Sequence, residues 1–229
     1  MTFSILAYDE KSGAYMGAAA TGSLCVGGWV LRGGIDSGLA ASQGTAPSTF
    51  WRDEGLALMR GGEQAGTALA QLTGPDTGRA HRQLSLLDLK GGAAGFTGTA
   101  SVPYAAHIAE GRRVAAGNML TGPKVLDALL AAVDDAAGDP AERLVAALRA
   151  GEAAGSDRRG LRSAALLVLH PDAPPLDLRI DRSQTPLDDL AALLTEARRS
   201  PYADWLHTVP VASARQRAPE ETPEVTSLD

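Results

Sequence analysis

Residues whose side chains can cleave an amide bond stand at predicted strand ends. Thr2 opens the first predicted strand (2–8), and Thr21 ends the next one (14–21). Met1 is commonly removed before a small residue, and its removal would leave Thr2 with a free α-amine. The hydroxyl can then attack a carbonyl while the amine takes the proton. Such an amine has a pKa of about 7.7–8.0, against about 10.4 for lysine, so part of it is neutral near pH 7.

Further polar residues can complete such a site. Asn118 follows a glycine at a strand end, and its side-chain amide, with a neighbouring backbone N–H, can donate hydrogen bonds to an oxyanion. Asp157 can hold the ammonium form of the α-amine, and Arg158 can bind a substrate carboxylate with its fork of donors. Thr21 and Gln43 end strands and are candidate substrate-binding residues.

Each candidate also has a purely structural interpretation. Many chains begin with Met-Thr, so the first residues alone favour Thr2 as an ordinary strand start. Asn118 taken singly is better explained as a helix cap or a left-handed turn. Asp157 beside two arginines fits a solvated turn with surface ion pairs. Thr21 can be an ordinary strand residue, and Gln43 can bond the backbone.

The composition limits which classes of binding partner fit this chain. The chain has 229 residues, 45% of them hydrophobic, a net charge of −6 and a pI of about 5.2. An acidic chain argues against nucleic acid or an anionic membrane as the main partner. No apolar run reaches membrane-spanning length, so we expect a cytoplasmic protein with no membrane partner.

No metal or other cofactor is predicted. Cys25 is the single cysteine, which rules out an intrachain disulfide and a cysteine metal site. The four histidines do not have metal-ligand spacing. No G-x-G-x-x-G motif follows the first strand, and no P-loop is present. Nucleotide-binding folds of those classes therefore fit poorly.

The elements that must position these residues alternate in groups. Strands are predicted at 2–8, 14–21, 25–31 (or a loop leading into a strand), 35–43, 79–89, 93–99, 112–118, 163–169 and 176–181. Helices are predicted at 50–60, 63–72, 123–136, 140–152 and 186–199. Strands in hairpins and helices in pairs favour two stacked, mainly antiparallel sheets with helices on both outer faces, an α+β fold with 2–8 as a central strand.

One domain is predicted over 1–200, and 201–229 is predicted to be a partly disordered C-terminal tail because it is rich in Pro, Glu and Ser. Small antiparallel sandwiches often cover sheet edges by pairing with another copy, so we also predict a homo-oligomer.

Four motifs together resemble one bacterial family. They are M-T-F-S-I-L-A-Y-D at 1–9, F-T-G at 96–98, G-N-M-L at 117–120 and S-D-R-R-G-x-x-S-A-A-L at 156–166. The family is the domain of unknown function 1028 (DUF1028), which looks like a member of the Ntn-hydrolase superfamily. The resemblance implies a four-layer αββα sandwich and amide hydrolysis by an N-terminal Thr, Ser or Cys. Only Thr2 matches that position here.

Two functions follow as hypotheses. The first is an amidohydrolase that acts on a small amide substrate, such as an N-acyl amine, a cyclic amide or a short peptide. The second is a non-catalytic protein that binds a small molecule on the same fold. A retained Met1 would block the α-amine and favour the second.

Overall fold

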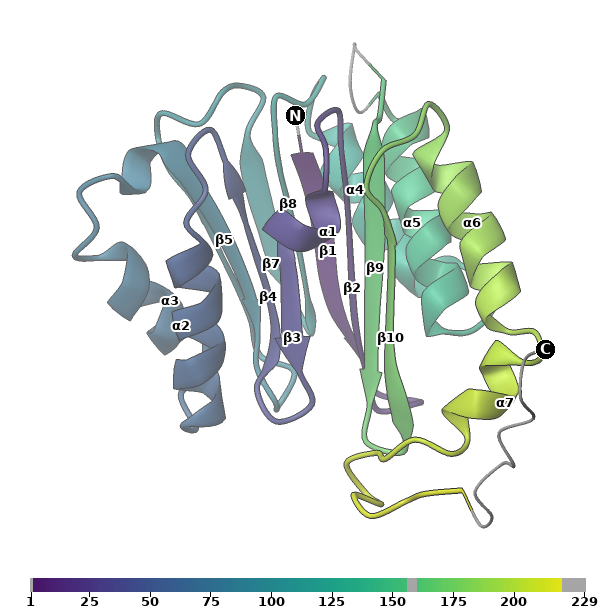
Figure 1. The fold of residues 1–229 in the computed structure, drawn as a ribbon. Coiled ribbons are helices and arrows are strands. Elements are labelled where there is room, and N and C mark those ends of the chain that lie inside the picture. The colour runs from purple at the N-terminus through teal and green to yellow at the C-terminus, as the bar shows by residue number, and fades with distance from the viewer. Residues whose placement is uncertain (1, 156–159, 220–229) are drawn as a thin grey trace, which may run out of the picture.

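Two antiparallel sheets pack face to face in the computed structural model, which describes residues 2–155 and 160–219 (Figure 1). The larger sheet has the strand order β10-β9-β2-β1-β8-β7. Its strands are β1 (Thr2–Asp9), β2 (Ala14–Thr21), β7 (Ala106–Glu110), β8 (Arg113–Asn118), β9 (Ser163–His170) and β10 (Ala173–Ile180). The smaller sheet runs β3-β4-β5-β6. Its strands are β3 (Leu31–Gly34), β4 (Gly38–Gly44), β5 (Arg82–Leu87) and β6 (Ala93–Thr97).

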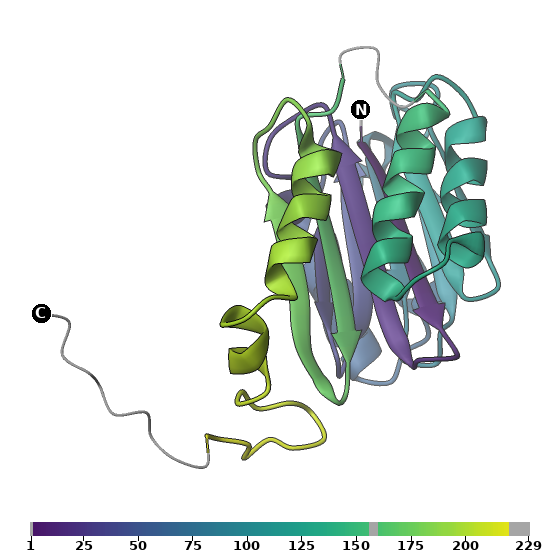
Figure 2. The same cartoon turned by 90° about the vertical axis from the view of Figure 1, so that its right-hand side faces the viewer.

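Helices pack on the outer faces of both sheets (Figures 1 and 2). The helices on the four-stranded sheet are α2 (Thr49–Arg60) and α3 (Ala65–Thr73). Those on the six-stranded sheet are α4 (Lys124–Asp135), α5 (Pro140–Ala153) and α6 (Pro186–Ala197). The prediction of two stacked antiparallel sheets is confirmed, and the arrangement is consistent with a sandwich.

β1 is a central strand, as predicted, and its alternation decides which way each side chain points. Phe3 and Ile5 are fully buried and pack in the cluster that includes α4 and α5. Leu6 is also fully buried, but it packs with Leu39 of β4 and Leu87 of β5. Since successive strand residues face opposite sides, the even-numbered residues of β1 face the space between the sheets.

The segment predicted as a strand over 25–31 differs from the structure. Residues Val26–Trp29 form the short helix α1, and β3 begins only at Leu31. Gly27 permits this because a Cβ there would lie 2.8 Å from the Cβ of Ala165 in β9. α1 therefore packs directly on the larger sheet, a contact that no local pattern in the sequence reveals.

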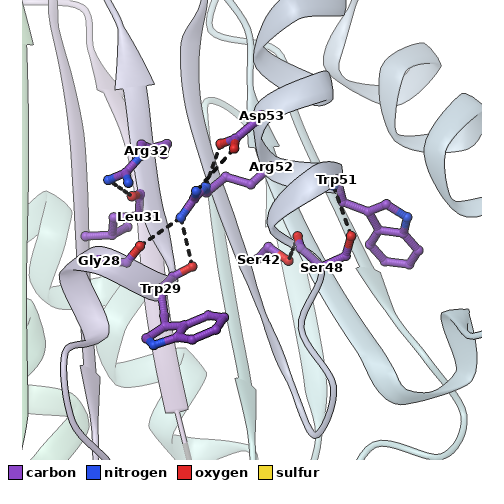
Figure 3. Close-up of polar contacts among 9 residues, drawn as sticks. All are labelled: Gly28, Trp29, Leu31, Arg32, Ser42, Ser48, Trp51, Arg52 and Asp53. Carbon is purple, nitrogen blue, oxygen red and sulfur yellow. Dashed lines mark hydrogen bonds and ion pairs between the residues drawn. The ribbon is translucent and has the colours of Figure 1, made fainter.

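Arg52 of α2 connects that helix to the short helix α1 by hydrogen bonds (Figure 3). The side chain is buried, and its Nη1 donates to the carbonyls of Gly28 and Trp29 at 2.9 and 3.0 Å. Its Nε donates to Asp53 at 2.8 Å, and this hydrogen bond lowers the pKa of Asp53. A guanidinium on the last carbonyls of a helix is favourable, and here it fixes the segment that follows β2.

Strand β7 and helix α7 were not predicted, because their sequence patterns are weak. β7 is an edge strand whose residues are partly buried or exposed, so it shows no clear alternation. α7 (Tyr202–Leu206) and a bridge between Val211 and Ala214 lie in the segment predicted as a tail. Within the described ranges, no helix is long and apolar enough to cross a membrane.

Candidate functional site

Four polar residues stand side by side across four adjacent strands of the six-stranded sheet. Thr2 pairs with Thr21 on one side and with Asn118 on the other, and Thr21 pairs in turn with Ser163. Residues directly opposite each other in an antiparallel sheet point to the same face. The row therefore faces the space between the sheets, at the end where β1 begins, which is the upper end in Figure 1.

The two threonine hydroxyls contact each other. Thr2 Oγ1 lies 3.0 Å from Thr21 Oγ1, and either can be the donor. Thr2 is partly buried, whereas Thr21 is only 4% exposed and also accepts from the backbone N–H of Ser23 at 3.3 Å. The structure thus brings Thr2 and Thr21 together, and Thr21 is placed to orient the hydroxyl of Thr2.

Asn118 reaches across to the smaller sheet. Its Nδ2 donates to Oε1 of Gln83 at 2.8 Å, and the side chain is 5% exposed. An amide nitrogen carries two N–H groups, so this bond engages one of them. The next backbone N–H, that of Met119, donates to the carbonyl of Val102 at 2.8 Å. The oxyanion role predicted for Asn118 would thus depend on its second Nδ2 hydrogen.

Gln43 of β4 lies in the smaller sheet, facing the start of β1. It is 2% exposed, and its Nε2 donates to Gln83 Oε1 at 3.1 Å and approaches the carbonyl of Thr2 at 3.5 Å. Its Oε1 is buried and has no hydrogen-bond partner among the described residues. Gln43 therefore contacts the start of β1 through Nε2. Among the described residues, only its Oε1 remains to accept a hydrogen bond from a substrate or from the α-amine.

Gln83 is the residue that sequence reasoning missed. It is fully buried, and its Nε2 lies near the carbonyls of Gly117 (2.8 Å) and Ala106 (3.1 Å) and the hydroxyl of Thr97 (3.0 Å). These acceptors require the nitrogen on that side, so Oε1 must face Gln43 and Asn118. The alternation of polar residues along 79–89 was the available signal, but it does not say which face is buried.

His107 of the edge strand β7 continues this network to Thr97 of β6, the edge strand of the smaller sheet. Its Nδ1 lies 3.0 Å from Thr97 Oγ1, and its ring occupies the space where a Cβ on Gly95 would stand. Burial lowers the pKa of His107 below its ordinary value. A neutral ring can accept the hydroxyl proton of Thr97 at Nδ1.

Two predicted site residues lie outside the described chain, and one residue of the polar row has a structural role. Asp157 and Arg158 lie outside the described residues, so their predicted roles stay predictions. Ser163 is structural, because its hydroxyl donates to the carbonyl of Ser23 at 3.0 Å and accepts from the N–H of Val26 at 3.1 Å. Within the described chain, no group of three or more His, Cys, Asp or Glu residues could hold a metal ion.

Three surface cavities of about 1060, 510 and 360 Å³ lie elsewhere in the described chain, and Thr2 lines none of them. The largest is at the opposite end of β1. Its charged side chains are largely paired, for example Arg143 with Asp9 and Arg112 with Glu10. Because those charges satisfy one another, we consider the polar row at Thr2 the better candidate site, although none of these three cavities opens beside it.

Comparisons with known proteins agree with this fold. A model of the family of unknown function DUF1028 matches residues 2–190. The crystal structure of protein SPO2555 from Silicibacter pomeroyi, described as a DUF1028 protein, is 48% identical to this chain. It superposes with a TM-score of 0.91 over 96% of each chain. A search of curated proteins finds no match.

Proposed function

Because the chain belongs to the DUF1028 family and places a hydroxyl pair at the start of its central strand, we propose that it hydrolyses a small amide with Thr2 as an N-terminal nucleophile. The observation that carries this proposal is the 3.0 Å contact between Thr2 and Thr21, with Asn118 paired to Thr2 on the other side. We further propose that the helices outside the two sheets form the four-layer αββα arrangement of the Ntn-hydrolase superfamily.

The proposed reaction needs the Met1–Thr2 bond to be cleaved first. The hydroxyl of Thr2 then attacks the substrate carbonyl while the α-amine of Thr2 takes the hydroxyl proton. Asn118 donates its second Nδ2 hydrogen to the oxyanion that develops. When the C–N bond breaks, the α-ammonium group gives its proton to the leaving nitrogen, and an ester to Thr2 remains.

Water completes the cycle. The α-amine removes a proton from a water molecule, which attacks the ester carbonyl and releases the acid. The hydroxyl of Thr2 regains a proton from the α-ammonium group. The buried Oε1 of Gln43 has no hydrogen-bond partner among the described residues, and Nε2 of the same side chain lies 3.5 Å from the carbonyl of Thr2. We propose that this Oε1 orients the ammonium form.

Screening an amide library with matched variants tests this function. Thr2→Ala should abolish turnover, and Thr2→Ser should keep it because the hydroxyl and the amine remain. Thr195→Ala is the control, since it removes an exposed hydroxyl on α6 that bonds only its own helix in the described chain. Equal activity in Thr2→Ala and the unchanged protein would contradict the proposal, and ligand binding without turnover would favour a binding protein.

A further inference from the structure

Arg162 lies just before β9, at the end of the six-stranded sheet where the polar row stands. Its backbone N–H donates to the carbonyl of Thr21 at 2.8 Å, and its carbonyl accepts from the N–H of Ser183 at 2.8 Å. Thr21 is also the residue whose hydroxyl contacts Thr2 at 3.0 Å. In the strand order β9-β2-β1, Arg162 is therefore separated from Thr2 by one strand.

The guanidinium of Arg162 carries a donor that no described residue satisfies. Its Nε is buried and has no hydrogen-bond partner in the described chain. The carboxylates on either side of Ser183 in the chain are engaged elsewhere. Asp181 pairs with Arg179 at 3.2 Å, and Asp189 accepts from the hydroxyl of Ser183. Because a guanidinium stays charged, a buried donor on it that lacks an acceptor costs free energy.

A carboxylate is the ligand that fits such a group best. Nε and the neighbouring Nη of an arginine donate in parallel, and the two oxygens of a carboxylate accept both hydrogens. A water molecule can accept from Nε, but it does not balance the charge. Arg162 as a whole is half-buried, so part of the residue is open to solvent although Nε is not.

We propose that Arg162 binds a carboxylate of the substrate, so that the site takes small amides with an anionic end, such as N-acyl amino acids or short peptides. This inference rests on the proposed function of Thr2. Neighbouring strands lie about 4.8 Å apart, so the backbones of Arg162 and Thr2 are about 10 Å from each other across the sheet. The arginine side chain can cover part of that distance, and a substrate of this size can cover the rest.

The position of Arg162 also separates the two contacts that such a substrate needs. Asn118, the proposed oxyanion donor, pairs with Thr2 from β8. Arg162 lies on the opposite side of β1, beyond β2. A carboxylate bound there would not compete with the oxyanion for the amide of Asn118.

Matched pairs of amides test the inference. One member of each pair is an N-acetyl ω-amino acid, and the other is the uncharged N-acetyl alkylamine of the same length. A second set carries the carboxylate on the acyl chain instead. Hydrolysis is measured as kcat/KM for each compound. At the best chain length, we expect the carboxylate to raise kcat/KM by about 10–100-fold, as a hydrogen-bonded ionic contact does.

Arginine variants assign the preference to one residue. Arg162→Gln should remove it, and Arg162→Lys should keep only part of it, because lysine cannot donate two parallel hydrogen bonds. Arg182→Gln is the control, since Arg182 is exposed and its loss changes the net charge by the same amount. Arg158, for which the sequence predicts a similar contact, lies outside the described residues, and Arg158→Gln is measured beside the others.

Three results would overturn the inference while leaving the nucleophile intact. They are equal kcat/KM values within every pair, a preference that Arg162→Gln retains but Arg158→Gln loses, and an Arg162→Gln variant that loses activity equally on both members of a pair. If no amide is hydrolysed, the proposed function fails, and calorimetric titration with the same acids decides on Arg162 separately. Binding that Arg162→Gln weakens by about tenfold or more would keep the carboxylate contact. Absence of binding would overturn it.

Discussion

Asn118 of the larger sheet donates to Gln83 of the smaller sheet at 2.8 Å, and the side chain of Gln83 is fully buried. The same Oε1 accepts from Gln43 at 3.1 Å. One amide thus holds two residues of the candidate site in place across the two sheets.

Replacing Gln83 should destabilise the protein and disturb the site. Gln83→Leu leaves buried donors of Asn118 and Gln43 without their acceptor, which we expect to lower the free energy of unfolding by about 2–4 kcal/mol. Gln71→Leu, on the exposed face of α3, should change it by less than about 0.5 kcal/mol. Denaturant titration measures both, and equal effects would show that the Gln83 network adds no stability.

We expect Asn118 to affect the rate of the chemical step rather than the binding of the substrate. Asn118→Ala removes the proposed oxyanion donor, so kcat for an active amide should fall by about 10²–10³-fold while KM changes little. Steady-state kinetics at a temperature where the variant is folded give the two constants. A fall in kcat of less than about tenfold would mean that Asn118 has only a structural role.

A largely buried ion pair stabilises the opposite end of β1. Arg143 contacts Asp9 at 3.1 Å and donates to the carbonyl of Val133 at 2.8 Å, and both charged side chains are largely buried. Burial alone would raise the pKa of Asp9, but hydrogen bonds from Ser12 and Arg143 outweigh it and lower this pKa. Arg143→Met should lower the free energy of unfolding by about 3 kcal/mol, because it leaves the largely buried carboxylate of Asp9 without its positively charged partner.

Another arginine of the same helix provides the control for this prediction. Arg149 pairs with Asp188 at 2.8 Å, but both side chains are more than half exposed. Arg149→Met should therefore cost less than about 1 kcal/mol. Thermal unfolding of the two variants compares them directly, and similar losses would contradict the role assigned to the buried pair.

His107 should make stability depend on pH. Its pKa is lowered in the folded protein, whereas the unfolded chain has the ordinary value of about 6.5. The unfolded chain therefore binds the proton first as the pH falls, and the free energy of unfolding should decrease below about pH 6.5. His107→Asn should reduce this dependence between pH 7 and 5, and His207→Asn, an exposed site, should preserve it. Unfolding curves across this range would contradict the prediction if both variants behaved alike.

The sequence predicts much of the fold because hydrophobic alternation and turn residues are local signals. It places Thr2, Thr21 and Asn118 at strand ends, and the structure pairs them directly. Gln83 could not be found in this way. Its partners come from the other sheet, so its role appears only when the two sheets are stacked. The helix at 26–29 depends likewise on packing against β9 rather than on its own sequence.

The mass of the N-terminal peptide before and after treatment with a β-lactone tests directly whether Thr2 is the nucleophile. If Thr2 is the nucleophile, the peptide begins at Thr2 and gains the mass of one lactone on that threonine. A peptide that still begins at Met1, or a lactone found only on another residue, would contradict the assignment of Thr2 as the nucleophile.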